Sequence, residues 1–268
     1  MTKPKVLVLT GYGINCEEET AFVFNKVGGQ SAICHVNDLI EAPSKLNEYQ
    51  ILALPGGFSY GDDTGSGNAL ANRLRNKLND AIQEFINRDS LILGTCNGCQ
   101  VAANLGIIPG FDDNYENRLI AFTHNASARY EDRWVHLKVE KTNCIFTRDL
   151  DSLYVPIAHG EGNFTTAPEV LKKLEQNNQV VVRYAKPDGA LAQQQFPHNP
   201  NGSINDIAGL CDPTGRIFGL MPHPERAIFF TNRPDWPLLK EQLKRQGKEI
   251  PDFAEPLKIF ENAVSYFN

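Results

Sequence analysis

The chain has 268 residues, of which 41% are hydrophobic and 22% charged, so it can bury the core of one large domain. Its formal net charge is −6 and it carries no run of lysine or arginine, which argues against a nucleic-acid partner. No apolar stretch has the length of a membrane span, and the first residues lead directly into a predicted strand, without a signal peptide. We therefore expect a cytoplasmic protein with no membrane partner, whose six cysteines are free thiols.

The N-terminal third alternates between strand and helix patterns. Apolar runs at 6–10, 31–36 and 50–55 predict buried strands, and 17–28 predicts a helix with acidic residues in its first turn. This alternation predicts an α/β fold with a doubly wound, mostly parallel sheet flanked by helices, in which ligands bind at the carboxyl ends of the strands. A partial Gly-x-Gly at 11–13 predicts no dinucleotide site, because Cys16 stands where a third glycine is needed.

The third predicted strand runs into Pro-Gly-Gly-Phe at 55–58. Two adjacent glycines, Gly56 and Gly57, allow a backbone to approach a ligand closely, although the same residues also form ordinary turns. A helix is predicted at about 66–88 from leucines at helical spacing. No Walker loop follows these glycines or occurs elsewhere, so the chain shows no recognisable ATP site.

A cysteine stands at the corner between the next strand, 91–95, and a helix that includes 101–105. A strand, a sharp turn and a helix start expose a nucleophile, and the helix N-terminus stabilises the Cys96 thiolate. A buried structural cysteine is the alternative on this segment alone. Cys96 and Cys99 also form a C-x-x-C, which a redox pair or half a zinc site would show. No second such pair exists, so we expect no metal and a buried Cys99.

The remainder of the chain adds strands at about 119–140, 154–162, 180–184, 207–210 and 216–221 and a helix at 168–177. The tail from about 234 predicts two helices. One apolar face, with Leu257, Phe260, Val264 and Phe267, packs either on the body or on a partner. No linker interrupts the chain, so we expect a single domain over 1–268 with a helical C-terminal extension.

A second candidate catalytic group follows the strand that ends near Met221. Pro224 favours an extended His223, and residues two apart on an extended chain point to the same side, so Glu225 can orient the His223 ring. His223 and Cys96 both follow strands, and the carboxyl ends of parallel strands share one edge of a sheet. The sequence therefore predicts a Cys-His-Glu triad.

The residues at 94–100 and 222–225 together resemble the class I (triad-type) glutamine amidotransferases. Within this family, the motifs at 56–62, 157–162, 199–203 with 207–209, and 219–227 are similar to those of a glutaminase subunit of purine biosynthesis. The resemblance spans roughly 5–230. Two features depart from it, namely the residues at 63–66 and a tail that is longer than in many small-subunit forms.

The resemblance implies that Cys96 attacks the side-chain amide of L-glutamine while His223 transfers protons and Glu225 holds His223. It further implies an oxyanion hole at Gly56, Gly57 and Asn97, and glutamine contacts at Phe58, Gln100 and Arg129. No cofactor is implied in this chain. Ammonia passes to a larger synthetase partner, possibly with a small bridging subunit, which uses ATP and Mg to convert formylglycinamide ribonucleotide to formylglycinamidine ribonucleotide.

Two alternatives remain at this stage. A stand-alone cysteine hydrolase of γ-glutamyl substrates would use the same triad without a partner. A non-catalytic regulatory subunit would keep the fold for docking, and would be expected to lack at least one member of the triad. Cys96, His223 and Glu225 are all present.

Overall fold

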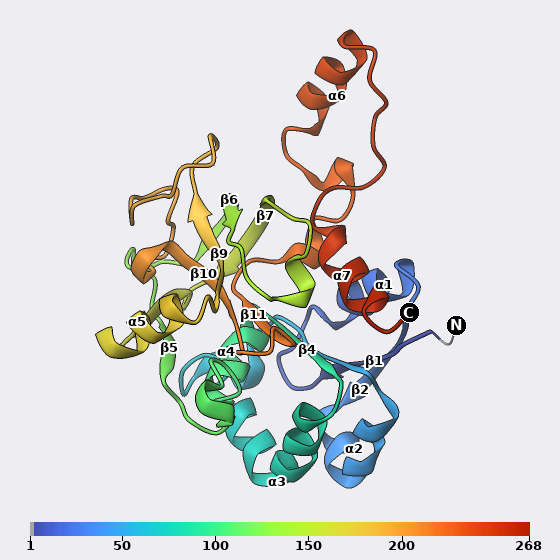
Figure 1. Cartoon of the computed structure of the whole chain (residues 1–268), viewed down its shortest axis with the longest axis vertical. Coiled ribbons are helices and arrows are strands. Elements are labelled where there is room, and N and C mark those ends of the chain that lie inside the picture. The colour runs from blue at the N-terminus through green and yellow to red at the C-terminus, as the bar shows by residue number, and fades with distance from the viewer. Residues whose placement is uncertain (1–2) are drawn as a thin grey trace.

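The computed structural model describes residues 3–268; Met1 and Thr2, where the absence of a signal peptide was argued, lie outside the described residues. Its centre is a nine-stranded sheet in the order β2-β1-β3-β4-β11-β10-β9-β6-β7 (Figure 1). The strands are β1 (Lys5–Thr10), β2 (Gln30–His35), β3 (Ile51–Leu54), β4 (Leu91–Thr95), β6 (Glu131–Val139), β7 (Ser152–His159), β9 (Val180–Ala185), β10 (Ile207–Cys211) and β11 (Ile217–Leu220). Every strand predicted from an apolar run is therefore present.

The sheet has a parallel half and an antiparallel half. From β2 through β1, β3 and β4 to β11 each neighbouring pair is parallel, which confirms the doubly wound fold class. From β11 to β7 each neighbouring pair is antiparallel. The change of direction occurs at β10, because a short turn joins it directly to β11, and such a turn reverses the chain.

Helices cover both faces of the sheet. On one face lie α2 (Val36–Glu41), α3 (Asn68–Asn87) and α4 (Asn97–Leu105), and on the other lie α1 (Glu17–Lys26) and α7 (Leu257–Ser265). The strand β4 shows the consequence, since Ile92 packs into the core of the first face while Leu91 and Leu93 pack into the core of the second. A strand buried on both faces is apolar throughout, which explains why the central strands were recognisable from sequence.

Three further elements lie outside this arrangement. The strands β5 (Ile120–Thr123) and β8 (Asn163–Thr166) form a small antiparallel sheet, and α5 (Pro168–Gln176) precedes β9. In the tail, α7 packs its apolar face on the body, with Phe260 against Phe24 of α1. The preceding helix α6 (Trp236–Arg245) has no buried residue and projects from the body (Figure 1). No helix within residues 3–268 is both long and apolar enough to cross a membrane.

Candidate active site

The turn between β4 and α4 holds Cys96 in a strained conformation. Its φ of 50° and ψ of −109° belong to neither strand nor helix, as in the nucleophile elbow that the sequence predicted. The turn is so tight that a Cβ added to Gly98 would lie 1.7 Å from the carbonyl oxygen of Leu54. Cys96 is 4% exposed, and its Sγ lies 3.8 Å from the carbonyl oxygen of Ala158. The glycine at 98 therefore allows the helix to start directly behind the cysteine.

His223 lies at the same edge of the sheet as Cys96. The strands β4 and β11 are parallel neighbours with Leu220 opposite Thr95, so the segments that follow the two strands enter the site side by side. Gly56 lies between the two side chains, since a Cβ added there would be 2.7 Å from His223 Cε1 and 3.4 Å from Cys96 Cβ. Only a residue without a side chain leaves this space open.

The carboxylate of Glu225 orients the His223 ring. Nδ1 of His223 donates to Oε1 of Glu225 over 2.6 Å, and both side chains are almost fully buried. Pro224–Arg226 forms a 3-10 turn, so the expectation of an extended segment is wrong, because Pro224 occupies the first position of that turn. The contact between His223 and Glu225 forms through this turn instead. Nε2 of His223 has no hydrogen-bond partner among residues 3–268 and is the nitrogen available to Cys96.

The charges around His223 favour its protonated form. Burial alone would lower the pKa of His223, but the Glu225 carboxylate and the neighbouring Cys96 raise it well above its ordinary value. A protonated imidazole beside a cysteine at a helix N-terminus stabilises a thiolate. The arrangement can therefore support nucleophilic attack by Cys96.

The loop after β3 lies close to Cys96, because a Cβ added to Gly56 would be 3.4 Å from Cys96 Cβ. Gly57 has a φ of +146°, and a Cβ added there would lie 2.5 Å from the carbonyl oxygen of Gly13. The N–H of Phe58 donates to that same oxygen over 2.7 Å, so it is not available to an oxyanion. Asn97 is the first residue of α4, where N–H groups have no partner within the helix. Its side chain accepts from the N–H of Ser59 over 3.2 Å and ties the loop to the elbow.

Gln100 has its side-chain amide engaged inside the protein. Nε2 donates to the carbonyl oxygen of Glu161 over 2.6 Å, and Oε1 accepts from Asn97 over 2.9 Å. Gln100 as a whole is 4% exposed. Gln100 therefore supports the elbow and the segment around Glu161, in contrast to the direct glutamine contact that the resemblance implied.

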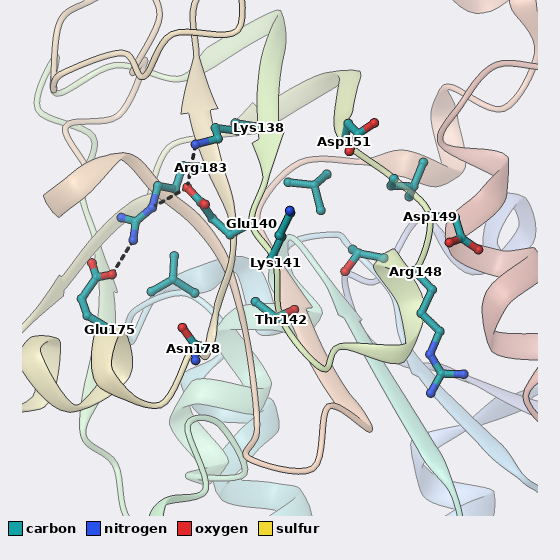
Figure 2. Close-up of a pocket in the computed structure, with 14 residues that line it drawn as sticks. Lys138, Glu140, Lys141, Thr142, Arg148, Asp149, Asp151, Glu175, Asn178 and Arg183 are labelled. Carbon is teal, nitrogen blue, oxygen red and sulfur yellow. Dashed lines mark hydrogen bonds and ion pairs between the residues drawn. The ribbon is translucent and has the colours of Figure 1, made fainter.

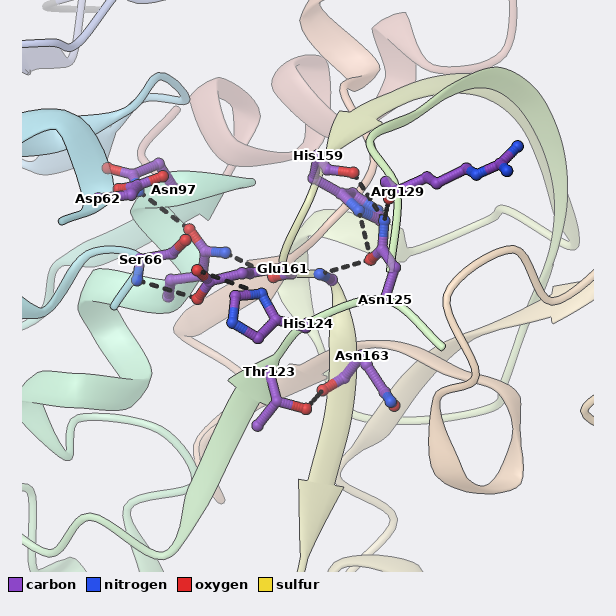
Figure 3. A network of polar contacts seen from close by, with 12 residues as sticks. Asp62, Ser66, Asn97, Thr123, His124, Asn125, Arg129, His159, Glu161 and Asn163 are labelled. Carbon is purple, nitrogen blue, oxygen red and sulfur yellow. Dashed lines mark hydrogen bonds and ion pairs between the residues drawn. The ribbon is translucent and has the colours of Figure 1, made fainter. Parts of the chain in front are cut away.

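A cavity of about 440 Å³ adjoins the elbow through Asp62, whose carboxylate accepts a hydrogen bond from the Asn97 side chain over 3.2 Å. Phe58 and Arg129 line it, whereas Gln100 does not. The rings of Phe58 and Tyr130 lie 6.1 Å apart at its wall. Its other lining residues are Asp62, Ser66, His124, Ala128, Gly160 and Glu161. Figure 3 shows the carboxylates of Asp62 and Glu161 on one side and the Arg129 side chain extending away from them. The cavity thus presents both signs of charge.

Two polar residues at this edge, His159 and Glu161, lie in the motif at 157–162 but were not predicted as site residues. The Glu161 carboxylate accepts from the N–H of Ser66 over 3.1 Å (Figure 3). Nδ1 of the buried His159 donates to Asn125 over 3.2 Å, and burial together with His223 lowers the pKa of His159 to about 3. The position of His159 and Glu161 at the end of β7 was the available signal, because strand ends carry sites in this fold.

A second cavity, of about 780 Å³, lies at the far end of β6, and Figure 2 shows its lining. Its buried cation Arg183 is paired with Glu140 over 3.2 Å and with Glu175 over 2.6 Å. The lining residues include no cysteine and no histidine. The chemistry of the predicted triad therefore belongs to the edge that carries Cys96.

The comparisons with known proteins agree with this geometry. The model of the CobB/CobQ-like glutamine amidotransferase domain matches residues 3–267, and the chain belongs to this family. It is 51% identical to phosphoribosylformylglycinamidine synthase subunit PurQ of Methanococcus maripaludis, over 99% of this chain and 98% of that one. It is 44% identical to the subunit of the same name from Dehalococcoides mccartyi, over 99% and 98% of the two chains.

A solved structure extends the match to three dimensions. The chain superposes on a chain in the structure of PurLQS from Thermotoga maritima with a TM-score of 0.71 and 27% identity, covering 100% of both chains. The resemblance to class I glutamine amidotransferases, and within them to the glutaminase subunit of purine biosynthesis, is thereby confirmed.

Proposed function

We propose that this chain hydrolyses L-glutamine with the triad Cys96, His223 and Glu225, as the glutaminase subunit of a cytoplasmic phosphoribosylformylglycinamidine synthase. The observation that carries the proposal is the position of Cys96 at a strained elbow beside His223, whose Nδ1 lies 2.6 Å from Glu225. The relatives at 44–52% identity over nearly the whole chain support the same assignment.

The reaction begins with attack of the Cys96 thiolate on the side-chain amide carbon of glutamine. The oxyanion accepts hydrogen bonds from the N–H groups of Gly57 and Asn97, with Gly56 giving the substrate room beside His223. His223 then gives its proton to the departing ammonia, which leaves a thioester on Cys96. A water molecule, activated by His223, attacks the thioester and releases glutamate.

The cavity beside the elbow holds the amino-acid end of glutamine. The Asp62 and Glu161 carboxylates meet the α-ammonium group. Arg129 lines the same cavity and meets the α-carboxylate once its side chain, which extends away from Asp62 and Glu161, turns inward. Phe58 contributes its ring, and Gln100 acts by holding Glu161 and Asn97 in place. No cofactor is needed for these steps.

Ammonia then leaves for a larger synthetase subunit, where ATP and Mg activate formylglycinamide ribonucleotide for conversion to formylglycinamidine ribonucleotide. The family of the matched relatives supports this division of work. A small bridging subunit belongs to the same proposal. The chain acts as a single domain over 1–268, with the helical extension from about 234 outside the catalytic body.

The test is the rate of glutamine hydrolysis by the purified chain, alone and with saturating synthetase partner. A subunit that cannot use ammonia should be a poor glutaminase by itself. Binding of the synthetase partner should order the Gly56-Gly57 loop and so supply an oxyanion donor, which raises the rate by about 10²–10³-fold. An increase in kcat of less than about tenfold would favour the stand-alone γ-glutamyl hydrolase instead.

A further inference from the structure

A second cysteine lies beside the catalytic histidine and takes no part in the proposed reaction. Cys16 is fully buried at the start of α1, and its Sγ is 4.0 Å from Nδ1 of His223. A Cβ added to Gly56 would lie 3.0 Å from that sulfur, so the thiol borders the same space as Cys96. Cys16 approaches the ring from the Glu225 side, away from the nitrogen that serves Cys96.

The side chains of Cys16, His223 and Glu225 form a compact set of metal-binding atoms. One ligand atom from each lies within 4.8 Å of the other two, and all three residues are buried. Oε2 of Glu225 is itself buried with no hydrogen-bond partner among residues 3–268, which leaves a carboxylate oxygen free for a ligand. A sulfur, an imidazole nitrogen and a carboxylate oxygen are the usual ligands of zinc, whose tetrahedral bond lengths place ligand atoms about 3.3–3.8 Å apart.

We propose, on the basis of the function above, that Cys16, His223 Nδ1 and Glu225 form an inhibitory site for a thiophilic divalent cation, with Zn²⁺ the ion that fits best. A water molecule completes the tetrahedron. Binding releases two protons to solvent, one from the Cys16 thiol and one from Nδ1 of the His223 imidazolium. The Nδ1 lone pair then binds the ion, and the neutral ring keeps its one proton on Nε2. His223 then cannot accept a proton from Cys96. Cys96 is therefore inactive as a nucleophile, although it is not itself a ligand of the ion.

The charged groups around Cys16 are compatible with a metal thiolate. Nη2 of Arg226 lies 2.9 Å from the Cys16 sulfur and can donate to the coordinated thiolate, as hydrogen-bond donors next to zinc ligands do. The charge of Arg226 is itself balanced, because its Nε lies 3.2 Å from a Glu19 carboxylate oxygen. The guanidinium nearest to the proposed site is therefore already paired with a carboxylate.

The direct test measures Zn²⁺ binding to the purified chain by competition with a chromophoric chelator. Cys96→Ala should still bind one equivalent, because Cys96 is not a ligand, whereas Cys96→Ala with Cys16→Ser should bind at least tenfold more weakly. Cys96→Ala with Cys34→Ser is the matched control, since Cys34 is also buried but is not part of the cluster. Equal Zn²⁺ affinity in all three variants, or none in Cys96→Ala, would overturn the proposal.

A second measurement links the site to activity and keeps it distinct from the proposed function. Zn²⁺ should inhibit glutamate release by the intact complex reversibly, with recovery on adding chelator, and Cys16→Ser should need at least tenfold more Zn²⁺. The same inhibition in Cys16→Ser would show that the ion acts at Cys96 and would overturn the proposal. Failure of the glutaminase assignment would appear as absent glutamate release, while binding to Cys96→Ala is measured without any turnover.

Discussion

Replacing Glu225 by glutamine removes one charge from the buried pair while keeping the size of the side chain. The pair joins His223 Nδ1 to Glu225 Oε1 over 2.6 Å, with 2% and 1% of the two side chains exposed. Two unit charges about 4 Å apart at an effective dielectric constant of about 20 interact by about 4 kcal/mol. If the transition state carries an imidazolium at His223, loss of that interaction slows the glutaminase by about 10³-fold.

The same substitution should lower the pKa of His223, because burial would then act without the opposing carboxylate. The assay is glutamate release by the complex, followed across pH. Glu175→Gln is the matched control, since Glu175 also forms a 2.6 Å ion pair, with Arg183, but at the remote cavity (Figure 2). A loss of less than tenfold in folded Glu225→Gln, or an equal loss in Glu175→Gln, would refute the role given to Glu225.

Three further outcomes are expected. Gly57→Ala should slow glutamate release by about 10²–10³-fold, because the alanine Cβ would clash with the backbone of Gly13. Gly189→Ala is the control and should stay near the wild-type rate, because a Cβ added there meets open space. Equal rates in the two variants would contradict the role given to the Gly56-Gly57 loop. In urea unfolding, the free energy of unfolding should fall as the pH is lowered from about 6.5 to about 3, by up to about 1.4 kcal/mol per pH unit. The reason is that His159 stays neutral in the folded protein but binds a proton in the unfolded chain. His159→Gln should flatten this slope more than a substitution at an exposed histidine. A diazo-ketone analogue of glutamine should label Cys96 and spare the other cysteines, and peptide mapping that found the label elsewhere would reverse that assignment.

The catalytic edge could be predicted because local signals and topology agree there. The apolar run at 91–95 and the small residues around Cys96 require a buried strand followed at once by a helix, and β4 and α4 are where those signals place them. The parallel pairing of β4 with β11 then brings His223 to the same edge. The pairing of His223 with Glu225 was predicted correctly from a wrong backbone conformation, since a proline-initiated turn made the same contact.

Contacts between distant segments could not be predicted from spacing. The side-chain amide of Gln100 is occupied by Glu161, and the N–H of Phe58 by Gly13, through contacts that only the folded chain creates. The approach of Cys16 to His223 is of the same kind, because the two residues are 207 positions apart. The short turn between β10 and β11 is a local signal that predicts an antiparallel pair. No local signal predicts the order of the other strands in the antiparallel half of the sheet.

The destination of the ammonia can be tested most directly with Cys96→Ala in the assembled complex. Synthesis of formylglycinamidine ribonucleotide should be measured with glutamine and, separately, with added ammonium salt as the nitrogen source. We predict that glutamine-dependent synthesis is abolished while ammonia-dependent synthesis continues at close to the wild-type rate, because Cys96 serves only to release ammonia. Loss of both activities in a complex that still assembles, or retention of the glutamine-dependent reaction, would contradict it.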